Sequence, residues 1–293
     1  MLEIQSFFEP DSGTWTYLVA DSRDKAAVII DPVGVYDPVS GSADDSFIGQ
    51  VLERARVAGY RIEWVLETHA HADHLTAANL VKERTGARTA CGRGITGVQE
   101  NFARVFNLPG LASDGSQFDR LLGEGDRIPL GQLEIRVIET PGHTGDSVTY
   151  LVEDAAFIGD TLFSPSFGTA RCDFPGGDAA RLYESISRLY QLPRETRLFL
   201  CHDYPAAGTE PVRECTVAES RKNNIHLREG TTRESFVAMR RQRDSQLGLP
   251  RLILPSLQVN IMAGRVPEAE DNGVSYLRIP FDRSVAELIK GEQ

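Results

Sequence analysis

Residues 67–78 read ETHAHADHLTAA. This stretch contains four candidate metal ligands: His69, His71, Asp73 and His74. The apolar run 62–66 (IEWVL) before it predicts a buried strand, and the spacing after it predicts a helix over 75–85. The turn therefore leaves the carboxyl end of a strand, where α/β proteins place binding and catalytic residues. Three imidazoles on so short a turn are costly to bury without a partner, and a metal ion supplies one.

Three further predicted strands also end in a histidine or an aspartate. His143 lies in TPGHTGDS, Asp160 in GDTLF and His202 in LFLCHDY. Neutral imidazole and carboxylate are ligands of zinc, iron and manganese, and the absence of cysteine from the first loop disfavours a closed structural zinc site. The sixth histidine, His226, stands apart from this set, and we expect it to be a core, capping or surface residue.

The rest of the chain alternates short β-branched runs with helical spacing. Strands are predicted over 4–7, 14–20, 26–30, 133–138, 147–152, 156–159 and 197–201, and helices over 45–58, 179–190, 212–222 and 233–244. Gly59 is the expected stop of the first helix, and Asp178 is the expected cap of the helix that follows GGDAA. The segment 249–264 (LPRLILPSLQVNIMAG) is apolar and interrupted by prolines.

The order and spacing H-x-H-x-D-H, His143, Asp160 and His202 are similar to the pattern of the metallo-β-lactamase superfamily, over about residues 14–205. The resemblance implies an α/β fold, the αββα sandwich, in which two mixed β-sheets are flanked by helices and the metal lies where the loops meet. We interpret residues 1–293 as a single domain. Its core covers about 1–205, and a helical and apolar C-terminal extension covers about 206–293.

The sequences around these residues resemble a narrower group, the persulfide dioxygenases of bacterial type, also called sulfur dioxygenases, which are related to glyoxalase II. The segments that carry this likeness are ETHAHADHLTAA, TPGHTGDS, GDTLF, RCDFPGGDAARLYESI, LFLCHDY and LPRLILPSLQVNIMAG. Cys172 departs from the pattern, because members commonly carry Thr in an R-T-D-F run; Arg171 and Asp173 match it.

This resemblance implies a mononuclear non-haem iron dioxygenase in which His69, His143 and Asp160 are the metal ligands and the catalytic residues. Two histidines and one carboxylate around one Fe(II) per chain leave coordination positions open for a persulfide sulfur and O₂. The implied reaction converts glutathione persulfide, O₂ and water to glutathione and sulfite, in sulfide detoxification. The resemblance leaves open whether four neighbouring residues surround this ion or hold a second one: His71, Asp73, His74 and His202.

Glutathione has two carboxylates and needs cationic partners in its pocket. Arg171 is the first candidate, since it matches the R-x-D-F run of the family and a guanidinium suits carboxylate geometry; the alternative is a structural pair with Asp173. Arg221, Lys222 and Arg228 are further substrate-binding candidates, for which a solvated face is the alternative. Tyr204 follows His202 closely and either lines the pocket or packs.

Two alternative functions use the same residues. A dinuclear zinc or iron hydrolase of glutathione thioesters, like glyoxalase II, needs much the same loops. The run after Asp160 favours the dioxygenase, and the extended helical domain with paired cationic residues that glyoxalase II uses is not evident. A sulfur-responsive binding protein on the same scaffold is disfavoured, because such a protein has little reason to keep an open metal site.

Composition excludes further classes. The 31 Lys and Arg residues against 42 Asp and Glu residues give a net charge of −11, which disfavours nucleic-acid binding. The apolar runs are too short to cross a membrane, and without a signal-like start we expect a cytoplasmic protein. The resemblance is compatible with a homodimer and with a separate sulfurtransferase as the persulfide source. Four cysteines without CxxC spacing are expected to be thiols: Cys91, Cys172, Cys201 and Cys215.

Overall fold

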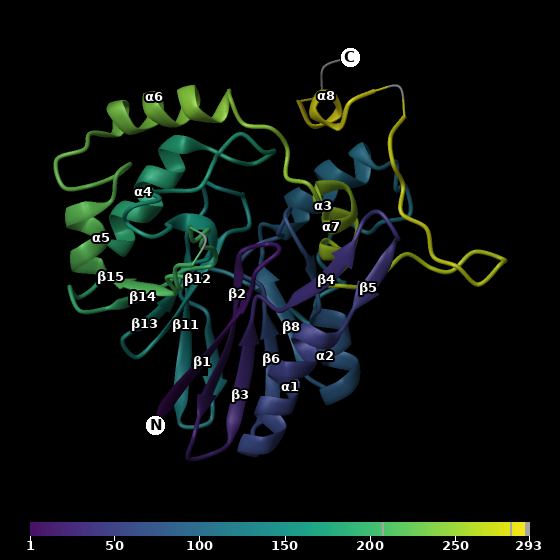
Figure 1. Ribbon diagram of the computed structural model, residues 1–293, viewed down its shortest axis with the longest axis horizontal. Helices are drawn as coiled ribbons and strands as arrows, with labels where there is room; N and C mark the ends of the chain where they lie inside the picture. Colours follow the sequence, from purple (N-terminus) through teal and green to yellow (C-terminus); the bar gives the residue numbers. More distant parts are fainter. Residues whose placement is uncertain (207, 282, 291–293) are drawn as a thin grey trace.

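Two mixed β-sheets form the centre of the molecule (Figure 1). The computed structural model describes residues 1–206, 208–281 and 283–290. In chain order the strands of the first sheet are β1 (Leu2–Glu9), β2 (Thr14–Asp21), β3 (Ala26–Ile30), β6 (Arg61–Leu66), β8 (Arg88–Gly92) and β9 (Arg120–Leu122). They are hydrogen-bonded in this same order, antiparallel from β1 to β3 and parallel from β3 to β9.

The second sheet is also hydrogen-bonded in chain order. Its strands are β10 (Arg127–Leu130), β11 (Leu133–Glu139), β12 (Val148–Val152), β13 (Ala155–Phe157), β14 (Arg197–Phe199) and β15 (Glu214–Thr216). Only the pair β13 and β14 is parallel in this sheet, and α4 (Ala179–Leu189) lies between these two strands in the chain. A parallel pair needs such a crossover, so the chain returns to the same end of the sheet and both β13 and β14 lead toward one edge.

The space between the sheets is filled by the inward residues of both. On β2, Tyr17 and Val19 point into this core, whereas Leu18 points to the opposite face of the sheet. Tyr17 packs edge-on against Phe157 and Phe199 of the second sheet, with ring centroids 5.0 and 5.4 Å away. Each large apolar side chain buried in this way stabilises the fold by roughly 1.5–3 kcal/mol, so the contacts between the sheets hold the sandwich together.

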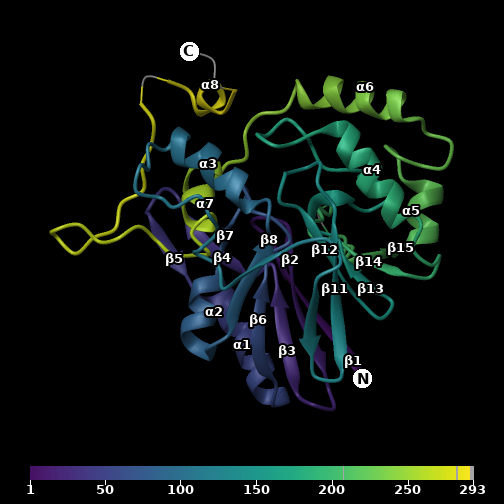
Figure 2. The same ribbon diagram turned by 180° about the vertical axis from the view of Figure 1, so that it is seen from behind.

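Helices cover the outer faces of both sheets (Figures 1 and 2). The apolar sides of α1 (Ser46–Ala58) and α2 (Ala78–Thr85) pack on the first sheet. On the second sheet lie α4, α5 (Val217–Asn223) and α6 (Arg233–Asp244). This arrangement is the predicted αββα sandwich, and the predicted fold class is confirmed.

A small third sheet and three helices surround the upper edge of the sandwich. The third sheet has the strand order β5 (Ser42–Asp44), β4 (Val33–Asp37) and β7 (Leu75–Thr76). The helices are α3 (Ile95–Val105), α7 (Ile253–Asn260) and α8 (Val285–Lys290). Because α7 packs against β7, the predicted apolar segment 249–264 lies beside the histidine-rich loop. None of the described helices is both long and apolar enough to cross a membrane.

Two helices begin later than the spacing predicts. The expected helix over 75–85 begins at Ala78, because Leu75 and Thr76 pair with β4. The expected helix over 212–222 begins at Val217, because the residues before it form β15. Thr216 and Glu219 make a capping box at this point, a signal that can be seen in the sequence. The predicted stop at Gly59 is confirmed, with φ of 72°.

Candidate metal centre

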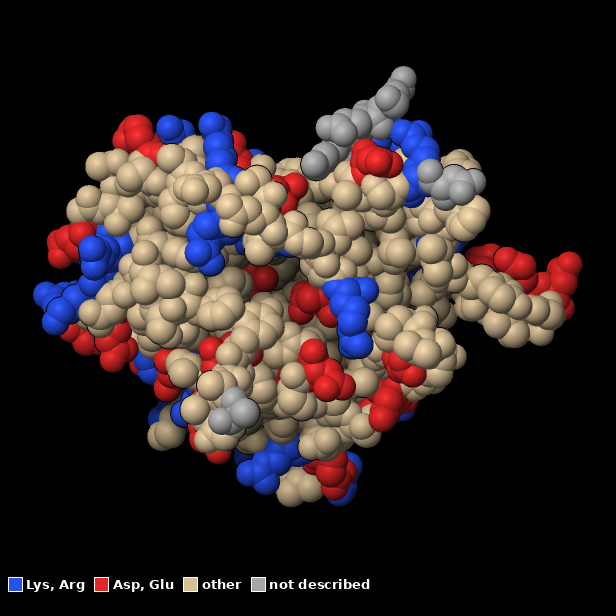
Figure 3. Space-filling model, turned by 45° about the horizontal axis from the view of Figure 1, so that its top comes forward, with Lys and Arg blue, Asp and Glu red and all other residues tan. Residues whose placement is uncertain are grey.

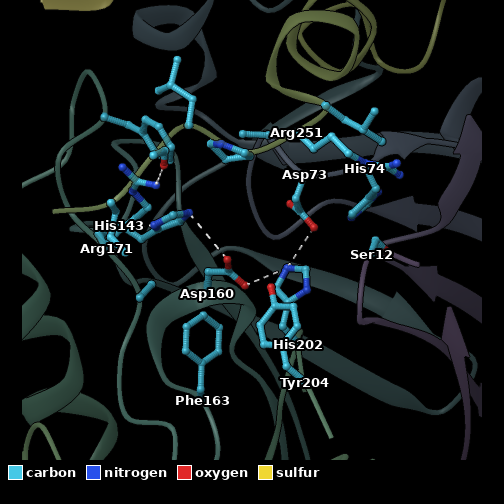
Figure 4. A pocket seen from close by; sticks show the side chains of 18 of the residues that line it. Ser12, Asp73, His74, His143, Asp160, Phe163, Arg171, His202, Tyr204 and Arg251 are labelled. Carbon is cyan, nitrogen blue, oxygen red and sulfur yellow. Dashed lines mark hydrogen bonds and ion pairs between the residues drawn. The ribbon is translucent and has the colours of Figure 1, made fainter. Parts of the chain in front are cut away.

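Four loops at one edge of the sandwich deliver the predicted ligand residues (Figure 4). The loop after β6 contributes His69, His71, Asp73 and His74, and the loop after β11 contributes His143. Asp160 lies in the single turn η1 (Gly159–Thr161) after β13, and His202 follows β14. The seven side chains lie close together, because strands β6, β11, β13 and β14 all end at this edge.

The carboxylate of Asp160 lies at the centre of the cluster. His69, His143 and Asp160 offer ligand atoms that all lie within 4.8 Å of one another. Asp160 Oδ2 is 4.0 Å from His69 Nε2 and 3.7 Å from His143 Nε2. The other oxygen, Oδ1, is 3.3 Å from His202 Nε2, which is itself 3.5 Å from Asp73 Oδ2. Asp160 therefore faces two groups of potential metal ligands: His69 and His143 near one oxygen, and His202 with Asp73 near the other.

Hydrogen bonds orient the imidazoles. His143 Nδ1–H donates to the carbonyl oxygen of Arg171 at 2.8 Å, and His74 Nδ1–H donates to that of Leu75 at 2.9 Å. These bonds leave the Nε2 atoms of both rings as acceptors directed to the cluster. Such bonds from the second ring nitrogen are typical of metal-binding histidines, since they fix the tautomer.

Several buried atoms of the cluster have no hydrogen-bond partner within the described part of the chain. They include His74 Nε2, Asp160 Oδ1 and His202 Nε2. Leaving a buried polar atom unpaired costs about 1–3 kcal/mol, and a cation between these atoms would satisfy them together. Imidazole nitrogens and carboxylate oxygens are donors that suit iron, zinc or manganese, so the residues fit such an ion.

The protonation states also suit metal binding. Burial lowers the pKa of His69 well below its usual value, and burial together with His71 lowers that of His74 to about 4. Burial raises the pKa of Asp73, but the neighbouring histidines outweigh it and bring it to about 2. Both imidazoles are therefore neutral near pH 7 and the carboxylate is ionised, which are the forms that bind metals.

His71 differs from the other histidines because it faces a buried carboxylate. Its Nε2 lies 3.1 Å from Asp31 Oδ1, and Asp31 also accepts hydrogen bonds from the backbone and the side chain of Thr68. Burial lowers the pKa of His71, but Asp31 outweighs burial and raises it to about 10. Asp31 thus holds the histidine-rich loop in place through its contacts with Thr68 and His71.

Asn260 holds the histidine-rich loop from the side of α7. Its Nδ2 donates to the carbonyl oxygens of His71 and His74 at 2.8 and 2.9 Å, and its Oδ1 accepts from the backbone N–H of Thr76 at 2.8 Å. All three bonds are buried, so the side chain of Asn260 ties the C-terminal extension to the metal loop. Asn260 was not among the predicted site residues.

A pocket with a volume of about 470 Å³ opens above the cluster, within the size range of small-ligand sites. Its floor includes His143, Asp160 and His202, and Figure 3 shows a hollow in this face of the molecule. Tyr204 lines the pocket, and its ring stacks on that of His202 with centroids 6.0 Å apart.

Arg171 also lines the pocket, but its guanidinium is largely engaged. It holds both carboxylate oxygens of Asp173 at 2.6 and 2.7 Å, and its Nη1 donates to the carbonyl oxygen of Gly248 at 2.6 Å. It also lies over the ring of Phe174, at 4.5 Å from the centroid. Arg171 thus forms the structural pair with Asp173 that was the alternative to glutathione binding. A contact between Arg171 and glutathione stays a prediction.

The structure does not bring the other predicted cations to the pocket. Arg221, Lys222 and Arg228 are exposed and outside its lining, and Arg221 pairs with Glu229 at 2.9 Å. His226, which stands apart in the sequence, does line the pocket, where its Nδ1 accepts from the backbone N–H of Thr169 at 2.9 Å. The pocket lining also contains three arginines that were not among the predicted site residues: Arg240, Arg243 and Arg251.

The four cysteines are free, as predicted, and the structure places all of them in buried positions. Burial raises the pKa of Cys201, which lies next to His202, and that of Cys172, which lies next to Arg171. Both thiols are therefore protonated near pH 7, the form that is poorly reactive.

Fold and site together define a metal-dependent α/β sandwich enzyme with an open pocket. The family model described as the metallo-beta-lactamase superfamily matches residues 10–202. The chain therefore belongs to the metallo-β-lactamase superfamily, as the sequence motifs indicate, and persulfide dioxygenases are among its homologues.

Three similar proteins place it within this superfamily. A protein of Burkholderia pseudomallei named a probable metallo-hydrolase is 50% identical, over 96% of this chain and 99% of the relative. The human mitochondrial persulfide dioxygenase ETHE1 is 31% identical, over 72% of each chain. The crystal structure of ETHE1 from Myxococcus xanthus is 30% identical with a TM-score of 0.72, and covers 90% of this chain and 100% of that one.

Proposed function

We infer that this chain is a persulfide dioxygenase that uses one Fe(II) to oxidise glutathione persulfide to sulfite. One observation carries the proposal: His69, His143 and Asp160 converge on one point beside an open pocket. This donor set is the two-histidine, one-carboxylate arrangement of non-haem iron oxygenases. The homology to persulfide dioxygenases supports the same function.

The three ligand residues would hold the ferrous ion, which supplies the redox chemistry that couples a persulfide to O₂. Two neutral imidazoles and one carboxylate leave the site a net positive charge, which favours an anionic persulfide. Phe163, Phe167 and Phe174 line the pocket and shield the reacting sulfur from water. The terminal sulfur loses four electrons and O₂ gains four, so the reaction to glutathione and sulfite needs no further reductant.

The proposal is tested by assaying iron-loaded and zinc-loaded protein with two substrates, glutathione persulfide and S-lactoylglutathione. We expect O₂ uptake and sulfite only from the iron form with the persulfide. Hydrolysis of S-lactoylglutathione by the zinc form, without O₂ uptake by the iron form, would contradict the proposal.

One feature of the geometry favours the hydrolase as the second candidate. Asp160 faces His143 with one oxygen and His202 with the other, as a carboxylate that bridges two ions does. The relative that is 50% identical is named a probable metallo-hydrolase. The number of bound metal ions distinguishes the two candidate functions. A dinuclear hydrolase needs a second ion, and the residues around His202 would hold it.

Asp73→Asn is the variant that distinguishes one ion from two. Asp73 lies 3.5 Å from His202 Nε2 and belongs to the second group of donor atoms. If one ion suffices, the variant retains one iron per chain and O₂ uptake within about tenfold of the parent. Metal analysis together with an oxygen electrode measures both quantities. Loss of a second equivalent of metal together with all activity would favour the dinuclear candidate.

Arg171→Ala is expected to raise the KM for glutathione persulfide about tenfold while iron stays bound. Arg171 holds the carbonyl oxygen of Gly248, another residue of the pocket lining, so its loss is expected to loosen the wall of the pocket. Steady-state kinetics and metal analysis measure the effect. Unchanged kinetics would remove Arg171 from the substrate-binding residues.

A further inference from the structure

The C-terminal extension forms one wall of the pocket. The family model ends at residue 202, whereas the pocket is also lined by His226, Arg240, Arg243 and the segment 247–252. In Figure 4, Arg251 lies on the side of Asp73 and His74, across the pocket from Arg171 and His143. The segment after residue 202 therefore contributes a substantial part of the pocket lining.

Two arginines in the lining are already neutralised inside the protein. Arg171 pairs with Asp173, and the buried Arg240 pairs with Asp244. Asp244 also accepts from the backbone N–H of Cys172 at 2.9 Å. These guanidinium groups hold the wall of the pocket in place and offer little charge to a ligand.

Three charged groups of the lining remain available. Arg243, at the end of α6, and Arg251, just before α7, are exposed and make no ion pair within 4.0 Å to any residue in 1–206, 208–281 or 283–290. Arg251 acts on Asp37 only from a distance, as one of the smaller causes that lower its pKa. Asp11 is exposed, and its carboxylate makes no hydrogen bond or ion pair with any of those residues, whereas the carboxylate of Glu9 accepts hydrogen bonds from Ser12. Apart from the metal cluster, the described lining of the pocket thus offers two unpaired cations and one unpaired anion.

We propose that Arg243 and Arg251 bind the two carboxylates, and Asp11 the ammonium group, of a peptide thiol that carries the persulfide. This proposal rests on the proposed function and names the groups that select its carrier. Glutathione has two carboxylates and one ammonium group, which matches the available charges in number and sign. Cysteine has only one carboxylate, and coenzyme A has phosphates and no ammonium group, so neither matches the set.

The test measures binding without turnover. Calorimetric titration of the metal-loaded protein with S-methylglutathione, which has no persulfide to oxidise, gives a Kd that does not depend on the reaction. Arg243→Gln and Arg251→Gln are each expected to weaken binding about tenfold, and Asp11→Asn about threefold, since each removes a charge-assisted contact. The matched control is Arg241→Gln, an exposed arginine on the same helix that lies outside the lining of this pocket.

The outcomes separate this proposal from the proposed function. Weaker binding in the Arg243 and Arg251 variants, with Arg241→Gln unchanged, supports the assignment even if the protein consumes no O₂. Binding within twofold of the parent in both variants would overturn it. Equal weakening in the control would also overturn it, because a general loss of charge would then explain the effect. Tighter, arginine-dependent binding of coenzyme A would assign the two cations to phosphates instead.

Discussion

Replacing His143 with alanine is expected to abolish iron retention and O₂ uptake together. Its Nε2 lies 3.7 Å from Asp160 Oδ2, and its Nδ1–H bond to Arg171 directs Nε2 to the cluster. The variant removes one of three proposed ligands, so we expect iron to fall to about a tenth of one equivalent and activity by about a thousandfold. The expected loss of activity exceeds the 10–100-fold typical of residues that only support a ligand. Metal analysis and an oxygen electrode measure both losses.

The control for this prediction is His226→Ala. His226 lines the pocket but lies outside the cluster of potential ligands. This variant is expected to retain iron at the level of the parent. An iron-loaded and active His143→Ala protein with a normal circular dichroism spectrum would remove His143 from the ligand set.

Replacing Asn260 with alanine is expected to damage both stability and metal binding. The variant leaves two buried carbonyl oxygens and one buried N–H without partners. Unpaired buried groups of this kind cost about 1–3 kcal/mol each. At about 2 °C per kcal/mol for a chain of this size, the three groups together are expected to lower the thermal midpoint by roughly 6–18 °C. Because the same bonds hold the loop of His71 and His74, iron affinity is expected to fall about 10–100-fold.

Calorimetry and titration with a competing chelator measure these two effects. The control is Gln242→Ala, which removes an exposed side chain on α6 and is expected to change neither quantity. A lower thermal midpoint with unchanged iron affinity would show that Asn260 stabilises the fold without positioning the metal loop.

The residues of the cluster could be selected from the sequence because their signal is local. Each follows an apolar run that forms a strand of the sandwich, so the topology brings the ends of these strands to one edge. Asp31 carries the same signal, since it directly follows β3, and it could have been selected on that ground. The layered fold itself followed from the resemblance of the motifs rather than from periodicity.

The remaining site residues were not predictable, because their roles depend on contacts between distant parts of the chain. Asn260 binds the carbonyl of His71 from 189 positions away, and nothing near Asn260 in the sequence marks that contact. Arg243 and Arg251 differ from other exposed arginines only in the pocket they face. Arg221 is the opposite case. Its position after His202 in the sequence predicted that it would line the pocket, but it lies outside the lining and pairs with Glu229.

The proposed function requires this metal site to couple a persulfide to O₂. Its most direct test is the ratio of sulfite formed to O₂ consumed by anaerobically purified, iron-loaded protein on addition of glutathione persulfide. The proposed function predicts equal amounts of both, with activity proportional to bound iron. Absence of O₂ uptake by fully iron-loaded protein would contradict it.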